Sequence, residues 1–338
     1  MKKQISDIKN CPCTLANGYD TYSPTALLRM FNNRKVSHLL DFSNDESSRV
    51  LFDDNIGRIS ISGVQEKLSA VVEKGKVCLT PAGVQGRYII KSVPDDKRLK
   101  YRNQMPANEH LTMQIARQVY GITTAENALI FFPDGEPAYI TKRFDVSVDG
   151  IKIKQEDFAS LEQKTNHTHG KHFKYTGSYA DMGRLFPKYV AAWQVEVSKF
   201  FRLVVFNYLF ANGDAHLKNF SLQQSKNGDY MLSPAYDLLN SSLHIQDEDF
   251  ALEGGLFEKG SYSEIYLQKG HPCQDDFITF GSMIGVPDIQ IQKIMKDFLI
   301  SQLLVYELTE RSFLDEQLKR MYIRSYGERL NRLKRTKL

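Results

Sequence analysis

The stretch Ala211–Phe220 (ANGDAHLKNF) and the stretch Leu232–Leu238 (LSPAYDL) decide how this chain is interpreted. Asp214 precedes Asn219 by five residues, and Asp237 follows Asn219 after eighteen more. An Asp and an Asn at this interval on one loop can place a carboxylate at a hydroxyl nucleophile and turn an amide oxygen toward magnesium. A later Asp at the end of a strand completes such a metal site. The spacing therefore predicts a phosphoryl-transfer site.

Within this site each residue has an expected role and a plainer alternative. Asp214 is the expected base for the attacking hydroxyl, although an Asp in an Asn-Gly-Asp turn is often only a turn former. Asn219 and Asp237 are the expected magnesium ligands, and their joint presence favours the catalytic interpretation. His216 suits a hydrogen-bonding role better than a catalytic one. Lys218 either neutralises the transferred phosphoryl group or faces solvent.

Upstream residues suggest how a nucleotide is held. Lys91 ends the apolar strand Arg87–Lys91, where it could reach nucleotide phosphates, and Glu109 on the following helix could pair with it. An exposed lysine at a strand end is the competing interpretation. The loop Ser60-Ile61-Ser62-Gly63 could supply backbone N–H groups to phosphate, a weak signal by itself.

Composition bounds the class of protein. The chain has 338 residues, of which 42% are hydrophobic and 25% charged, as is typical of a globular protein with two modest lobes. No apolar run approaches the roughly 20 residues that cross a bilayer, and the Met-Lys-Lys start is followed by polar residues, which predicts a cytoplasmic protein. Four cysteines lack paired zinc spacing and are expected to be free thiols.

Basic residues concentrate at the C-terminus. The net charge is +4, but the last twenty residues hold eight basic side chains and one acid, and the remainder carries a net charge of −3. The body is therefore not a basic nucleic-acid binder, and contact with a polyanion would centre on the tail. A solvated C-terminal helix is the expected form of this tail.

The order of elements predicts an α+β chain with a small β-rich N-lobe over 1–150 and a helical C-lobe over 151–338. Ser23-Pro24 opens a short helix, and Pro106 opens a second that ends near Gly121. The other expected elements are strands within 58–72 and at 77–79, 87–91, 128–132 and 138–144, a mobile loop at 164–179 and a core helix at 189–210.

Seven blocks of sequence together resemble one family, the HipA-type serine/threonine kinases of bacterial toxin–antitoxin systems. The blocks are SISGVQEK (60–67), YIIK (88–91), NEH (108–110), KRFD (142–145), QED (155–157), NGDAHLKNF (212–220) and SPAYDL (233–238). They occur in order between about 58 and 240. Motifs of P-loop ATPases, Rossmann oxidoreductases and zincins are absent from the sequence.

This resemblance implies a two-lobed, atypical protein-kinase-like fold that uses Mg-ATP. Asp214 would be the catalytic base, Lys91 would contact the ATP phosphates, and the backbone of Lys142, Arg143 and Phe144 would bind adenine. Ser62, with Ser60 as a second candidate, would be autophosphorylated to switch the kinase off. The implied substrate is an aminoacyl-tRNA synthetase, and the implied partner is a HipB-like DNA-binding antitoxin.

The 59 residues before Ser60 look too short for the extra N-terminal subdomain of full-length HipA proteins. The chain therefore resembles the shorter HipT form most, which implies a small HipS-like partner that supplies this subdomain. Two alternatives remain: a pseudokinase that binds a transcriptional regulator, and a small-molecule kinase. Intact catalytic residues disfavour the first, and the HipA-like blocks disfavour the second.

Overall fold

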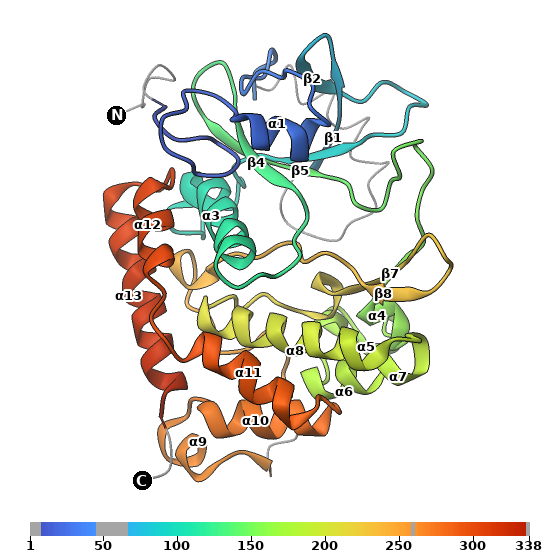
Figure 1. Ribbon diagram of the computed structural model, residues 1–338, viewed down its shortest axis with the longest axis vertical. Helices are drawn as coiled ribbons and strands as arrows, with labels where there is room; N and C mark the ends of the chain where they lie inside the picture. Colours follow the sequence, from blue (N-terminus) through green and yellow to red (C-terminus); the bar gives the residue numbers. More distant parts are fainter. Residues whose placement is uncertain (1–7, 45–66, 258–260, 336–338) are drawn as a thin grey trace.

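The computed structural model describes residues 8–44, 67–257 and 261–335. Elements α1 to β5 form an N-lobe and elements β6 to α13 form a helical C-lobe, most of which lies below it, with α12 and the upper part of α13 beside α3 (Figure 1). The N-lobe elements are α1 (Pro24–Phe31), β1 (Lys67–Glu73), β2 (Lys76–Leu79), β3 (Tyr88–Lys91), η2 (Arg102–Gln104), α3 (Met105–Gln118), β4 (Asn127–Phe131) and β5 (Pro137–Lys142).

The C-lobe contains most of the helices and a small sheet. Its elements are β6 (Gln155–Asp157), α4 (Phe158–Leu161), α5 (Asn166–His169), η3 (Phe173–Tyr175), α6 (Tyr179–Arg184), α7 (Phe186–Tyr189), α8 (Trp193–Leu209), η4 (Leu217–Asn219), β7 (Ser221–Gln224), β8 (Tyr230–Leu232), η5 (Ser241–Leu243), α9 (Glu264–Lys269), α10 (Gln274–Met283), α11 (Asp288–Phe298), α12 (Leu303–Arg311) and α13 (Glu316–Leu333). None of the helices described is both long and apolar enough to cross a membrane.

The N-lobe sheet is antiparallel, with strand order β2-β1-β3-β5-β4. Alternation along its strands separates two faces. Ile90 and Ile140 belong to the small core that also contains Phe31 of α1. Lys91 lies opposite Tyr139 in the register and faces the other way, toward α3. The sheet therefore presents a lysine to the helix that the sequence predicts as its partner.

Helix α8 is the centre of the C-lobe and is buried along most of its length. Phe200 of α8 packs against Phe186 and Phe220, with ring centroids 5.3 and 5.5 Å apart. The predicted helix at 189–210 begins later, at Trp193, because the chain is extended at Val190 after α7. The helix is followed directly by the loop that carries Asp214, so its packing fixes where that loop starts.

Two segments expected to be a mobile loop and a solvated helix contain structure that the sequence does not predict. The region 164–179 contains two helical turns, α5 and η3, and Thr165 caps α5 in a capping box. The basic tail forms α13, whose inner face is buried: Tyr322 and Tyr326 are fully covered. Arg329 is also buried and pairs with Asp249. Helix α13 is therefore a core element with a polar outer face.

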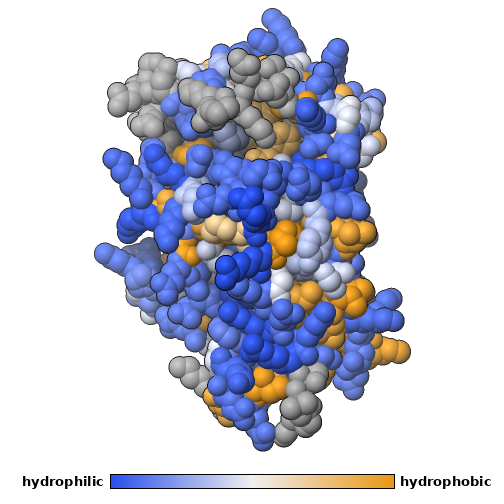
Figure 2. Space-filling view, turned by 90° about the vertical axis from the view of Figure 1, so that its left-hand side faces the viewer, coloured by the Kyte–Doolittle hydropathy of each residue, from blue (hydrophilic) through white to orange (hydrophobic). Residues whose placement is uncertain are grey.

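Helix α13 runs along one side of the molecule, from the level of α3 toward α9 and α10 (Figure 1). The face on that side is largely hydrophilic, with scattered apolar patches (Figure 2). On the inner side, the Tyr322 hydroxyl lies 2.9 Å from Oγ1 of Thr112 on α3. The last helix of the C-lobe thus supports the helix of the N-lobe.

We expect Tyr322→Ala to lower the free energy of unfolding by about 3–5 kcal/mol, because it empties a fully buried aromatic site. Tyr322→Phe, which removes only the hydroxyl contact, should cost about 1 kcal/mol. Urea denaturation measures both. Arg324→Ala on the exposed face of the same helix is the control, and an equal loss in that variant would contradict a core role for Tyr322.

His110 on α3 is buried, and its Nε2 lies 3.0 Å from the carbonyl oxygen of Cys13. Burial lowers its pKa to about 4. Since the unfolded chain binds a proton near pH 6.5 and the folded chain does not, stability should fall as pH drops from about 6.5 toward 4, by up to about 1.4 kcal/mol per pH unit. The difference in unfolding free energy between wild type and His110→Gln should show this slope; a pH-independent difference would refute it.

Candidate active site

A buried ion-pair cluster joins the two lobes. The Lys91 ammonium lies 2.6 Å from Oε1 of Glu109 and 2.5 Å from Oδ1 of Asp237. These residues come from the end of β3, the middle of α3 and the loop after β8. A second ammonium, that of Lys67 on β1, lies 3.8 Å from Oδ2 of Asp237. The predicted pairing of Lys91 with Glu109 is present, and Asp237 joins it.

The charges in this cluster set each other's protonation. Burial by itself would lower the pKa of Lys91, but Asp237 and Glu109 outweigh it and hold that pKa above its ordinary value. Burial would likewise raise the pKa of Asp237, yet Lys91 and Lys67 hold it well below its usual range. For Glu109 burial prevails over the attraction of Lys91, and its pKa is raised. The two lysines therefore hold Asp237 in its ionised form.

The backbone at Asp237 is unusual. Its φ is +56°, in the left-handed region of backbone conformation that residues other than glycine rarely adopt. Asn212 donates to its carbonyl oxygen at 3.4 Å and also bonds the Asn207 side chain at 2.8 Å. Strained backbone of this kind is concentrated at functional sites, where surrounding contacts enforce it. The conformation directs the carboxylate toward the lysines.

The loop after α8 carries Asp214 and Asn219. The Nδ2 atom of Asn219 donates to the backbone oxygen of Asp214 at 2.8 Å, so the amide oxygen of Asn219 is the atom left for a cation. The Asp214 side chain is 53% exposed and accepts a hydrogen bond from the Tyr175 hydroxyl at 3.0 Å. Partial burial raises the pKa of Asp214. A half-exposed carboxylate at the end of a rigid helix can receive a proton from an incoming hydroxyl.

The two other predicted residues of this loop are held by neighbours. Nε2 of His216 lies 3.9 Å from Oδ1 of Asp214, and burial followed by the charge of Lys174 lowers the pKa of His216 to about 3. His216 is therefore neutral, and its buried Nδ1 has no hydrogen-bond partner within the described ranges. Lys218 neither faces solvent freely nor points at an open site: its ammonium lies 2.6 Å from Oδ2 of Asp157.

The segment predicted to bind adenine leads out of β5. The backbone N–H of Lys142 donates to the backbone oxygen of Glu126 at 2.8 Å, and that of Arg143 donates to the backbone oxygen of Arg87 at 2.9 Å. The Phe144 ring packs on Tyr236 with centroids 5.6 Å apart. Two of the three N–H groups are thus already engaged, and adenine binding by this segment stays a prediction.

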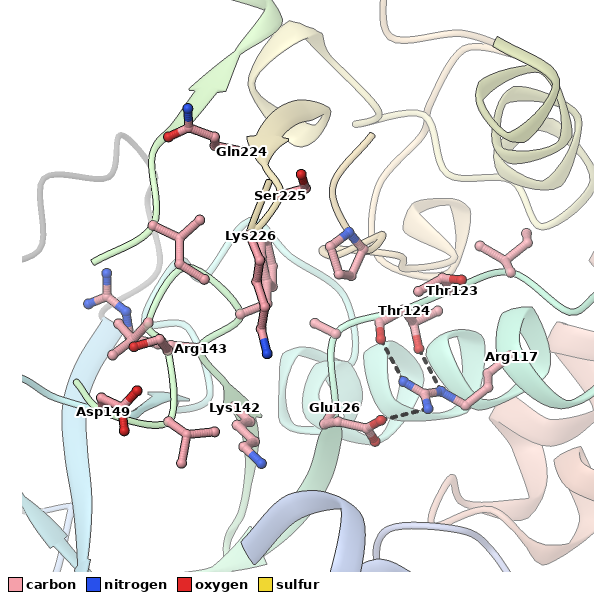
Figure 3. Close-up of a pocket in the computed structure, with 18 of the residues that line it drawn as sticks. Arg117, Thr123, Thr124, Glu126, Lys142, Arg143, Asp149, Gln224, Ser225 and Lys226 are labelled. Carbon is pink, nitrogen blue, oxygen red and sulfur yellow. Dashed lines mark hydrogen bonds and ion pairs between the residues drawn. The ribbon is translucent and has the colours of Figure 1, made fainter. Parts of the chain in front are cut away.

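These same three residues line a cavity of about 750 Å³. Figure 3 shows its walls: Arg117 bonded to Thr124 and Glu126 on one side, and Lys142, Arg143 and Asp149 on the other. The residues Lys91, Asp214, Asn219 and Asp237 do not line it. The cavity is therefore separate from the cluster that would carry the chemistry.

Magnesium is the metal that the sequence predicts. The described part of the chain contains no group of three or more His, Cys, Asp or Glu side chains that could hold a metal ion. Mg²⁺ does not need one, because it keeps several waters and binds one or two protein ligands together with nucleotide phosphates. The ionised carboxylate of Asp237 and the amide oxygen of Asn219 fit that requirement. Ser60, Ser62 and Gly63, predicted to contact or accept phosphate, lie outside the described residues.

The structure adds residues that the sequence does not single out. Lys67 lies beside Lys91 because the two are register partners on β1 and β3. Asp157 ends the QED block and both caps α4 and holds Lys218. Tyr175 reaches Asp214 from a segment 39 residues upstream. Strand alternation could have indicated Lys67, whereas Tyr175 gives no local signal.

A small β-rich lobe, a helical lobe and an ion-pair cluster between them define a protein with a two-lobed, protein-kinase-like fold. The family model for the HipA-like C-terminal domain matches residues 59–302, and the chain belongs to this family. The resemblance inferred from the seven blocks is thereby confirmed.

Sequence relatives include a Haemophilus influenzae protein named "Putative kinase", 26% identical over 91% of this chain and 91% of its own length. The Sinorhizobium fredii protein "Putative kinase Y4dM" is 34% identical over 62% of this chain, a match that spans 51% of that protein.

Solved structures support the same fold. HipA of Shewanella oneidensis, in a complex with HipB and operator DNA, matches with a TM-score of 0.60 and 19% identity over 81% of this chain and 65% of that chain. The Helicobacter pylori proinflammatory kinase CtkA matches with a TM-score of 0.50 and 14% identity over 78% of this chain and 93% of that chain. This chain thus spans less than two thirds of the HipA chain that it matches.

We expect Lys91→Met to destabilise the protein by about 3 kcal/mol, because it leaves the buried Glu109 and the partly buried Asp237 without their shared cation. Combining it with Glu109→Gln should restore part of the loss, since one of the uncompensated charges disappears. Chemical denaturation of both variants tests this, with Lys293→Met on the exposed face of α11 as control. A Lys91→Met protein as stable as wild type would show that the pairs contribute nothing.

Proposed function

We propose that this chain is a Mg-ATP-dependent protein kinase that phosphorylates serine or threonine hydroxyls. The observation that carries the proposal is the contact of one lysine with two acids from different lobes: Lys91 with Glu109 and with Asp237. Protein kinases require this combination, in which a strand lysine pairs with a helix glutamate and a downstream Asp holds the metal. The names of the sequence relatives agree with it.

The roles of the chain's residues follow from their surroundings. Asp214 accepts the proton of the acceptor hydroxyl, and the hydrogen bond from Asn219 to its backbone fixes where it stands. Asp237 and the amide oxygen of Asn219 hold the metal ion, and Lys91 orients the phosphates. Bound Mg-ATP supplies the transferable phosphoryl group, with magnesium neutralising its charge.

The residues around these groups mainly keep the loop that carries Asp214 and Asn219 in position. Lys218, anchored on Asp157, ties the catalytic loop to β6, which disfavours the alternative in which it neutralises the phosphoryl group directly. His216 packs beneath Asp214 as a neutral ring. We therefore assign contact with the ATP phosphates to Lys91. Lys218 and His216 are assigned the role of positioning the loop that carries Asp214.

We further propose that the kinase is the toxin of a toxin–antitoxin pair. Membership of the HipA-like family and the fold shared with a HipA that assembles with HipB and DNA support a HipB-like antitoxin as partner. A small HipS-like protein is the second candidate. The resemblance to this family also supports an aminoacyl-tRNA synthetase as the substrate.

We expect Asp214→Asn to slow phosphoryl transfer by about 10²–10⁴-fold while Mg-ATP still binds, because it removes the base and leaves the metal ligands. Asp237→Asn should instead weaken the magnesium-dependent part of ATP binding. Isothermal titration with and without EDTA reports binding, and ADP release with intact-mass spectrometry reports transfer. Asp229→Asn in the β7–β8 turn is the matched control.

The outcomes separate the alternatives. Phosphate added only to active protein and mapped to Ser60 or Ser62 would support autophosphorylation of that loop. Mg-ATP binding without any ADP release, by protein that starts unphosphorylated, would favour the pseudokinase that binds a regulator. No binding of Mg-ATP at all would overturn the proposal.

A further inference from the structure

The hydroxyl of Tyr175 lies where an acceptor hydroxyl has to lie. It donates to Oδ1 of Asp214 at 3.0 Å. A general base must be within about 2.6–3.2 Å of the group whose proton it takes, so this contact has the geometry required of a substrate. The donor here belongs to the chain itself.

The contact is not needed to hold the backbone of Asp214 in place. The backbone oxygen of Asp214 accepts from the His216 N–H at 2.8 Å and from the Asn219 side chain at 2.8 Å. Its own N–H contacts Oδ1 of Asn212 at 3.4 Å. Three bonds from within the same loop thus fix the backbone of Asp214, whereas its carboxylate accepts a bond from Tyr175, which comes from a different segment.

That segment is attached in a way that permits release. Residues 166–172 are all exposed. Three bonds from other segments fasten the backbone at 175–177: Glu253 N–H to Tyr175 O and Gly254 N–H to Gly177 O, each 2.9 Å, and the Lys164 ammonium to Thr176 O at 3.0 Å. Gly177 has φ +92°, a conformation that glycine adopts without strain. A change of φ and ψ near Gly177 can therefore move Tyr175 without disturbing α6.

The phenol ring is guided onto the base by its neighbours. The His216 ring meets it edge-on with centroids 5.2 Å apart, and the Lys174 ammonium lies 4.9 Å from its centroid. Tyr175 itself remains partly exposed. The ring is therefore placed by weak contacts that an incoming chain can replace.

We propose that Tyr175 is an internal competitor for the acceptor position. In the resting protein its hydroxyl is hydrogen-bonded to the Asp214 carboxylate, and it must leave before a substrate hydroxyl can bind there and be phosphorylated. The inference rests on the proposed kinase function and adds a gate to it. A substrate segment would have to be extended enough to enter beside the displaced Tyr175. Its phosphorylation would depend on the free energy needed to displace Tyr175.

Tyr175→Phe tests this gate, because it keeps the ring and deletes the competing hydroxyl. With a peptide library that has a fixed central serine as probe, we expect kcat/KM to rise about tenfold, as for loss of a hydrogen bond to a charged group. Hydrogen exchange without nucleotide should be faster at the amides of 174–178 in the variant. Tyr19→Phe, an exposed N-lobe tyrosine, is the control.

Each result decides the matter. A slower or unchanged Tyr175→Phe enzyme beside an active wild type would overturn the gate alone, since Tyr175 would then position the base or do nothing. Unchanged exchange at 174–178 would also overturn it, because the hydroxyl would not be holding the segment. An inactive wild type that binds no Mg-ATP would overturn the proposed function and the gate together. Phosphate found on Tyr175 would support its placement at the acceptor position.

Discussion

The contact of Lys91 with Glu109 and Asp237 is the interaction on which the rest of this structure depends. Two neighbouring carboxylates repel, and removing each from water is costly, so the ammonium between them stabilises both. The cation comes from a strand, one anion from the helix behind that strand and the other from the C-lobe. Any relative movement of the lobes that separates these groups leaves a charge uncompensated, which couples the arrangement of the lobes to the competence of the site.

Much of this could be predicted from the sequence. The helix that begins at Pro24, the hairpin at Lys74-Gly75 and the helix carrying Glu109 are set by local signals: a capping serine, a turn glycine and a proline near a helix start. The pairing of Lys91 with Glu109 follows from the position of one at a strand end and of the other on the next helix. The loop with Asp214 and Asn219 is where the preceding apolar helix predicts it.

Other features arise from contacts between segments far apart in the chain, which no local pattern encodes. Lys218 was equally suited to a phosphate and to solvent, and the carboxylate of Asp157 that binds it comes from β6, 61 residues away. The tail has the charge of a solvated helix, yet its tyrosines at four-residue spacing, Tyr322 and Tyr326, supply a buried face. Polar composition favoured a mobile loop at 164–179, whereas the segment contains the capped turn α5 and accepts backbone bonds from Glu253 and Gly254.

The position of α13 has a consequence for how the protein is made. Tyr322 of this helix lies in hydrogen-bond contact with Thr112, one turn beyond Glu109 on α3. Because domains fold as their residues emerge, α3 must wait through the synthesis of some 200 further residues for its packing partner. A nascent chain that lacks α13 therefore has an incompletely supported α3, and the packing around the Lys91 cluster is complete only after α13 has been synthesised.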